Sequence, residues 1–140
     1  MKIIVLTKSL LFASRPRQSQ ELVFHYQLAN CPGKSVIGMK VKFSPGAASP
    51  PHRHGGASVA AVVLEGSVFN KMNDHPTTVV EMGGTWYEAP SCHHKICANA
   101  SETEPAMLFA TFVVDTSVIN EGGYRALVVV DEEYRDIKLM

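Results

Sequence analysis

The chain of 140 residues has no excess charge of either sign and no long apolar run. Its 13 Lys and Arg balance 13 Asp and Glu, and it has no basic cluster, which argues against a nucleic-acid-binding protein. The longest apolar runs, 57–64 and 108–114, are far shorter than the roughly 20 residues that span a bilayer. We therefore expect neither a nucleic-acid partner nor a membrane partner.

Cysteine is also scarce. Cys31, Cys92 and Cys97 are an odd number without a C-x-x-C spacing. Such a set provides neither a disulfide framework nor a cysteine zinc site. It is typical of a reducing compartment, and we expect a cytoplasmic protein.

Helical periodicity is nearly absent, whereas Gly and Pro separate many short segments rich in Val, Ile, Phe and Thr. The expected strands are residues 2–7, 21–27, 35–43, 58–64, 67–71, 77–81, 85–88, 94–98, 106–115 and 126–130. Ten short strands predict one all-β domain, a sandwich or a barrel. The charged segment 131–140 is expected to be a short terminal helix or a loose tail.

Two of these strands predict where the core lies. Met39, Val41 and Phe43 alternate with lysines, so this strand has one apolar face and one wet face. Segment 57–64 has no polar face, and we expect a central strand covered on both sides. Its small side chains leave room for a cavity beside it.

Four of the six histidines lie in two short motifs. His52 and His54 flank Arg53, and residues two apart in a strand project to the same face, so this pair forms a two-imidazole clamp. His93 and His94 follow about forty residues later. A third ligand from a neighbouring strand would complete one face of an octahedron and leave positions open for water, oxygen or substrate.

Glycines frame these motifs. Gly46 precedes His52 by six positions, Gly66 ends the following strand, and a second block runs from Gly83 to His94. The two blocks resemble the cupin superfamily motifs G-x5-H-x-H-x3,4-E-x6-G and G-x5-P-x-G-x2-H-x3-N. The resemblance covers nearly the whole chain.

This resemblance implies a small single-domain jelly-roll β-barrel over residues 1–140, with its barrel core at about 35–115. It also implies a divalent metal held by three histidines. The implied ligands are His52, His54 and His94.

The chain departs from the cupin pattern at several positions. The glutamate position of the first motif falls on Val59 or, with the shorter spacing, on Ser58. Ala89 and Ser91 replace Pro and Gly of the second motif, and Asn99 comes one place late. Three neutral imidazoles would leave a divalent ion with its full charge, so negative charge would have to arrive with an anionic substrate.

Three-histidine cupins similar to this arrangement include dioxygenases that use ferrous iron. The resemblance therefore implies a non-heme iron oxygenase acting on a small anionic or enolisable molecule, with Fe(II) favoured and Zn, Mn or Ni as alternatives. The same enolate, reprotonated elsewhere, would give an isomerase, cyclase or lyase, which needs a general base. A non-catalytic barrel that binds metal or a small molecule is a third hypothesis.

The candidate catalytic residues are Tyr87, Glu88 and His93. Only one of Tyr87 and Glu88 can face inward, because neighbours in a strand point to opposite faces. An inward Glu88 would have its pKa raised by burial and act as the base, and an inward Tyr87 would donate to an oxyanion. His93 is a further candidate for the base; alternatively, we expect it to support the metal ligands from outside or to be exposed. Trp86 and Met39 are expected in an apolar pocket wall.

The amino-terminal segment resembles a signal peptide only faintly. Lys8 interrupts its apolar stretch, and Arg15 and Arg17 stand where a cleavage site would have small residues. We interpret residues 2–7 as a strand of the mature protein. Because small cupins often pair through sheet edges and an exchanged amino-terminal strand, the resemblance implies a homodimer in which this strand takes part.

Overall fold

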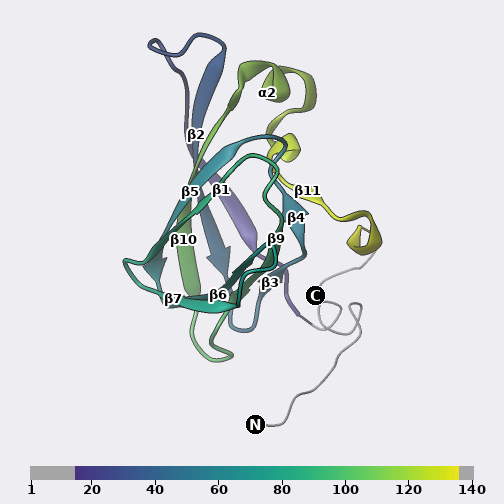
Figure 1. Ribbon diagram of the computed structural model, residues 1–140. Coiled ribbons are helices and arrows are strands. Elements are labelled where there is room, and N and C mark those ends of the chain that lie inside the picture. Colours follow the sequence, from purple (N-terminus) through teal and green to yellow (C-terminus); the bar gives the residue numbers. More distant parts are fainter. Residues whose placement is uncertain (1–14, 136–140) are drawn as a thin grey trace.

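A computed structural model describes residues 15–135, so the strand expected at residues 2–7 lies outside the described residues. Two antiparallel sheets face each other (Figure 1). One has five strands in the order β1 (Ser19–Gln27), β2 (Lys34–Phe43), β10 (Ala106–Asp115), β5 (Ser58–Glu65) and β8 (Thr85–Glu88). The other has the order β11 (Val129–Val130), β4 (His52–Arg53), β9 (His94–Asn99), β6 (Ser67–Met72) and β7 (Thr78–Glu81), with β3 (Ala48–Ser49) paired to β9. The predicted all-β jelly roll is confirmed.

The core lies between the two sheets. Met39, Val41 and Phe43 of β2 are buried, while Lys42 between them is exposed, so the predicted apolar face is confirmed. Val68 of β6 joins the same buried cluster from the other sheet. Residues from both sheets thus enclose one apolar interior.

The prediction for segment 57–64 was only partly right. Val59, Ala61 and Val63 of β5 are buried, but Ala60 is exposed and Leu64 is 42% exposed, so one face of the strand meets solvent. The reason is that β5 lies in the five-stranded sheet, and within residues 15–135 no further layer covers the outer face of this sheet over β5. Its inward small side chains do border a cavity, as expected.

A single residue separates β5 from β6, although the two strands belong to different sheets. Gly66 makes this crossing with φ = 71°, and a Cβ atom there would lie 2.6 Å from the carbonyl oxygen of Pro105. Glycine is required both by the left-handed backbone and by the close approach. The glycine of the first motif therefore has a structural explanation.

The segment after β10 differs from the prediction. The chain forms the helix α2 (Thr116–Gly122) and the 3-10 helix η1 (Tyr124–Leu127) before β11, instead of one strand over 126–130. Helices of one or two turns carry too little periodicity to be recognised in a sequence. For the segment 131–140 we expected a short helix or a loose tail; its described part contains the 3-10 helix η2 (Glu132–Tyr134), and residues 136–140 lie outside the described residues. In the described part of the chain, no helix has the length and apolarity needed to cross a membrane.

Candidate metal centre

The first two histidines of the site lie on β4 and directly after it. Pro50 and Pro51 lead into this strand, whose extended backbone turns His52 and His54 inward and Arg53 outward. His52 is 5% and His54 9% exposed, against 51% for the Arg53 side chain. This is the alternation that the H-x-H spacing predicts.

The third histidine comes from the neighbouring strand. β4 pairs antiparallel with β9, and His94 stands opposite His52 in the register. The ligand atoms that His52, His54 and His94 offer lie within 4.8 Å of one another. The structure thus brings together the three histidines that the cupin resemblance implies.

Hydrogen bonds behind the rings fix which nitrogens are free. His52 Nδ1 lies 2.7 Å from the carbonyl oxygen of Pro50, and His54 Nδ1 lies 2.7 Å from that of Leu127. A carbonyl oxygen only accepts, so both Nδ1 atoms carry the proton and both Nε2 atoms keep a lone pair. His94 Nε2 donates to Asn70 Oδ1 at 2.6 Å, which leaves Nδ1 as its free nitrogen.

Burial keeps the rings of His52 and His94 neutral. It lowers the pKa of His52 to about 3, with a further lowering from the neighbouring His94 and His54. It also lowers the pKa of His94 to about 4, although Glu88 acts in the opposite direction. Both imidazoles are therefore in the form that binds metal at neutral pH.

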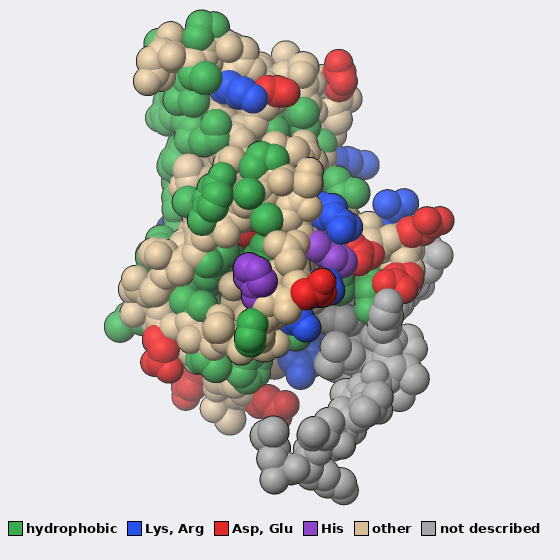
Figure 2. All heavy atoms as spheres, in the orientation of Figure 1, with side chains coloured by type: hydrophobic (Ala, Val, Ile, Leu, Met, Phe, Trp, Pro, Cys, Tyr) green, Lys and Arg blue, Asp and Glu red, His purple; other side chains and the backbone are tan. Residues whose placement is uncertain are grey.

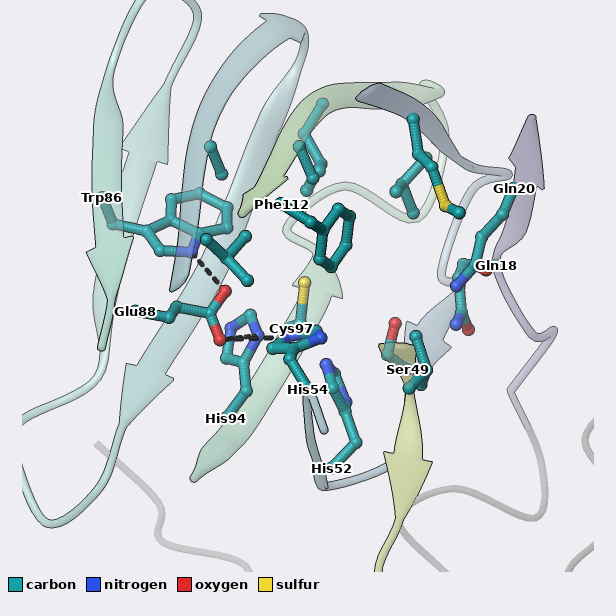
Figure 3. A pocket seen from close by; sticks show the side chains of 17 residues that line it. Gln18, Gln20, Ser49, His52, His54, Trp86, Glu88, His94, Cys97 and Phe112 are labelled. Atoms are coloured by element: carbon teal, nitrogen blue, oxygen red, sulfur yellow. Dashed lines mark hydrogen bonds and ion pairs between the residues drawn. The ribbon is translucent and has the colours of Figure 1, made fainter. Parts of the chain in front are cut away.

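A carboxylate enters the same cluster from β8. Glu88 is 3% exposed, and its Oε1 lies 3.1 Å from His54 Nε2 and 3.5 Å from His94 Nδ1 (Figure 3). Its Oε2 accepts a hydrogen bond from Trp86 Nε1 at 3.1 Å. Tyr87 points outward, 62% exposed, with its hydroxyl 3.1 Å from Ser58 Oγ, so it does not reach the cavity to stabilise an oxyanion.

The expectation of a raised pKa for Glu88 is wrong. Burial does raise the pKa, but the nearby imidazoles of His54 and His94 and the hydrogen bond from Trp86 together lower it by more. The pKa of Glu88 is lowered to about 2. The site therefore holds an ionised carboxylate at neutral pH, which the sequence pattern of three histidines alone does not contain.

The free atoms of the cluster fit a cation. Among the described residues, His54 Nε2 and Glu88 Oε1 are buried without a hydrogen-bond partner, although they lie 3.1 Å apart. With the proton of His54 on Nδ1, both facing atoms are acceptors, and two buried acceptors at this distance repel each other. A metal ion bound by the histidines would satisfy them, so the residues present fit a metal site.

The remaining candidates lie outside the cluster. His93 Nε2 lies 2.8 Å from Asp131 Oδ2, and His93 does not line the cavity. Cys92 is half-buried near Asn73 Nδ2, at 3.6 Å. Cys97 does border the cavity, and burial raises the pKa of its thiol far above the ordinary value, so it stays protonated.

A cavity of about 40 Å³ adjoins the three histidines. This volume holds about three water-sized groups, which is room for an ion's open positions or for one end of a small molecule. Its wall is mostly apolar, and includes the expected Met39 and Trp86 together with Val59, Ala61 and Phe112 (Figure 3).

A second hollow of about 280 Å³, here called the vestibule, lies next to this cavity. The two spaces share Gln18, Gln20 and Val128 as lining residues. The other described residues that line the vestibule are Arg17 and Arg125, and none of the lining residues among those described is acidic. On the face shown in Figure 2, acidic and basic side chains are otherwise interspersed.

A comparison with known proteins now decides the family. The family model of the cupin domain matches residues 39–113, more than half of the chain. The chain belongs to the cupin family. A curated relative, germin-like protein subfamily T member 2 from Arabidopsis thaliana, is 49% identical over 41 residues, which are 27% of this cupin and 19% of that protein. The match therefore spans less than a fifth of the relative's length.

Solved structures show the same fold at low identity. The structure of KdgF from Halomonas sp. matches with a TM-score of 0.56 and 17% identity, over 69% of this cupin and 77% of that chain. The cupin domain of Schizosaccharomyces pombe Cnp3 gives 0.60 and 16%, over 77% and 68%. Oxalate oxidase in complex with the substrate analogue glycolate gives 0.54 and 21%, over 75% of this cupin and 58% of that chain. These likenesses establish the fold of the cupin alone.

Sequence reasoning missed several residues of this cupin's site. Asn70 and Leu127 hold histidine rings, and Gln18 and Gln20 border both spaces. None of them belongs to a motif, and each reaches the site through strand pairing or a turn far along the chain. The one available signal is Asn70, a polar residue at an inward position of the strand 67–71.

Proposed function

We propose that this cupin is a metal-dependent enzyme that converts a small anionic or enolisable organic molecule, with an oxygenase as the first reading. The observation that carries the proposal is the convergence of three buried histidines beside a small cavity. Imidazole nitrogens suit Fe, Zn, Ni and Cu. An ion held by His52, His54 and His94 would supply Lewis-acid chemistry and, as Fe(II), oxygen activation.

The entrance supports an anionic substrate. Arg17 and Arg125 line the vestibule, so they attract a carboxylate or enolate toward the cavity. The amides of Gln18 and Gln20 offer hydrogen bonds further in. Because the inner cavity has only about 40 Å³, it admits the reacting end of the molecule and leaves the remainder in the vestibule.

The apolar wall gives the reaction a dry environment. Val59 and Phe112 form an apolar wall beside the histidines, and electrostatic interactions are stronger next to such a wall than in bulk water. Trp86 holds one oxygen of Glu88 and so fixes the orientation of the carboxylate. The negative charge of Glu88 is thus held in a fixed orientation before substrate binds.

An isomerase or lyase is the second candidate. The observation that favours it is the ionised carboxylate of Glu88 beside the histidines, because such a reaction needs a proton acceptor. The two candidates differ in their need for oxygen.

The test is metal analysis followed by turnover with and without oxygen. We expect one divalent ion per chain, iron if the oxygenase reading is right, and oxygen uptake with small 1,3-dicarbonyl compounds or 2-hydroxy acids such as glycolate, which is bound in the oxalate oxidase of similar fold. Turnover without oxygen would establish the isomerase or lyase, and metal without turnover a binding protein. A chain that binds no divalent metal would overturn the proposal.

The matched variants are His52→Ala and His75→Ala. His75 is an exposed histidine in the turn before β7 and does not line the cavity, so its loss controls for the removal of an imidazole. We expect His52→Ala to lose metal and activity and His75→Ala to keep both. Equal behaviour of the two variants would contradict the ligand assignment.

A further inference from the structure

The cavity wall contains a residue where the cupin motif has its glutamate. Counting from Gly66 places that position at Val59, which is 1% exposed and borders the cavity. The side chain at the motif's glutamate position therefore still points into the cavity, but it is the apolar side chain of Val59. Val59 cannot bind a metal, so β5 supplies no ligand at this position.

The register of the sheet places a carboxylate directly across from this position. β5 pairs antiparallel with β8, and Val59 stands opposite Glu88. Directly opposed residues point to the same face of the sheet, with Cβ atoms about 4.5–5.5 Å apart. Glu88 thus enters the cluster from the next strand, and its longer side chain spans this offset.

We infer that Glu88 is the fourth protein ligand of the metal, so that the carboxylate of the site has moved from β5 to β8. The inference rests on the metal site proposed above. It makes Glu88 a ligand rather than a free base, and it lowers the charge of a divalent site by one relative to three histidines alone. A carboxylate oxygen is also a donor that suits Mn and, together with histidines, Fe(II).

Three contacts support this role. Trp86 occupies Oε2 of Glu88 and leaves Oε1 free. That free atom lies 3.1 Å from His54 Nε2 and 3.5 Å from His94 Nδ1, on the side of the histidine group away from His52 (Figure 3). Oε1 and His54 Nε2 are both buried acceptors without a hydrogen-bond partner in the described structure. One cation would satisfy both.

A shared proton is the competing explanation. It would require His54 to carry protons on both nitrogens and to form an ion pair with Glu88, which leaves one ring fewer for the metal. The two explanations predict opposite effects when the charge of Glu88 is removed. Loss of the carboxylate weakens metal binding if Glu88 is a ligand, and strengthens it if Glu88 only competes for His54.

The experiment measures the affinity for Co²⁺ and Mn²⁺ by chelator competition, with the visible spectrum of bound Co²⁺ as a second readout. We expect Glu88→Gln to bind at least about 10-fold more weakly and to change the Co²⁺ spectrum. The control Glu81→Gln removes an exposed carboxylate on β7 and should change neither. The double variant Val59→Glu, Glu88→Val returns the carboxylate to β5 and should recover affinity.

The outcomes separate this inference from the proposed function. Unchanged or tighter binding by Glu88→Gln, with an unchanged spectrum, overturns the ligand role and leaves the three-histidine site standing. Absence of binding by the unaltered chain overturns both. If Glu88→Gln does not fold, a crystal structure of the unaltered chain with Co²⁺ decides instead: a Glu88 oxygen at about 2.0–2.2 Å from the ion supports the role, and one bonded to His54 overturns it.

Discussion

At the residue scale, Asn70 orients the ring of His94 from a position outside the cavity. Its Oδ1 accepts from His94 Nε2 at 2.6 Å, and Asn70 itself is buried on β6 and absent from the cavity wall. Outer partners of this kind set the orientation and tautomer of a ligating histidine. Asn70 is thus a positioning residue for the metal centre.

We predict that Asn70→Ala weakens metal binding about 10- to 100-fold, the range typical for loss of such partners. The reason is that the His94 ring loses the acceptor that keeps Nδ1 unprotonated. Chelator competition measures the effect, and Asn120→Ala, in an exposed position on α2, is the control. Affinity within a factor of two of the unaltered chain would contradict the positioning role.

The ligands and their partners were not equally predictable. His52, His54 and His94 could be found because a fixed spacing with framing glycines places each on a strand. Glu88 was recognised only as one of two alternatives, and its pKa was predicted in the wrong direction. The sequence does not show that His54, His94 and Trp86 surround its carboxylate.

At the scale of elements, the two faces of β5 have different surroundings: one lines the cavity and the other meets solvent. Ala61 points inward to the cavity, while its neighbour Ala60 points to solvent. The period of two along a strand makes this pair a matched test of the cavity, because the same substitution adds the same atoms on opposite sides of one sheet.

We predict that Ala61→Leu fills much of the cavity of about 40 Å³ and lowers turnover at least about 10-fold, while metal remains bound because no ligand changes. Ala60→Leu should keep turnover. Metal content and steady-state kinetics measured on the same samples check this. Loss of metal in Ala61→Leu, or equal losses of turnover in both variants, would show that the cavity is not the substrate site.

The limits of prediction at this scale follow from element length and pairing. Strands such as β8 and β10 were predicted with the observed bounds, because they are rich in β-branched and aromatic residues. β3 and β4 have two residues each and carry no pattern of their own. The pairing of β5 with β8 joins segments far apart along the chain, and only the folded sheet shows it.

At the scale of the whole molecule, the buried histidines make stability depend on pH. The pKa of His52 is lowered to about 3 and that of His94 to about 4, against 6.5 in an unfolded chain. Between these values the unfolded state binds more protons, so the free energy of unfolding falls as pH falls below about 6.5. Glu88 contributes only below its ordinary value of 4.5, because its pKa is lowered.

We predict that the metal-free protein loses about 2 kcal/mol per histidine, for His52 and His94, between pH 7 and pH 5. Urea unfolding at a series of pH values measures this loss. His52→Asn should reduce the slope by about half, whereas His75→Ala should leave it unchanged. A free energy of unfolding that is constant from pH 7 to pH 5 would show that the rings are not buried in neutral form.

The edge of the five-stranded sheet bears on assembly. In the described part of the chain, β1 pairs with β2 on one side only, and its Leu22, Val23 and Tyr26 are 43%, 46% and 64% exposed. An exposed apolar edge strand is a template for pairing with another chain. We propose that β1 forms the contact of a homodimer, whether or not residues 2–7 take part.

Light scattering after size exclusion should therefore give a mass twice the 15.3 kDa of one chain. Val23→Lys places a charge on the edge and should shift the equilibrium toward the monomer at micromolar concentration. Val79→Lys places the same charge on β7, an edge of the other sheet where Val79 is 51% exposed, and should leave the dimer intact. A monomeric unaltered chain would rule out the dimer. Equal dissociation by both variants would assign the contact to general surface charge rather than to β1.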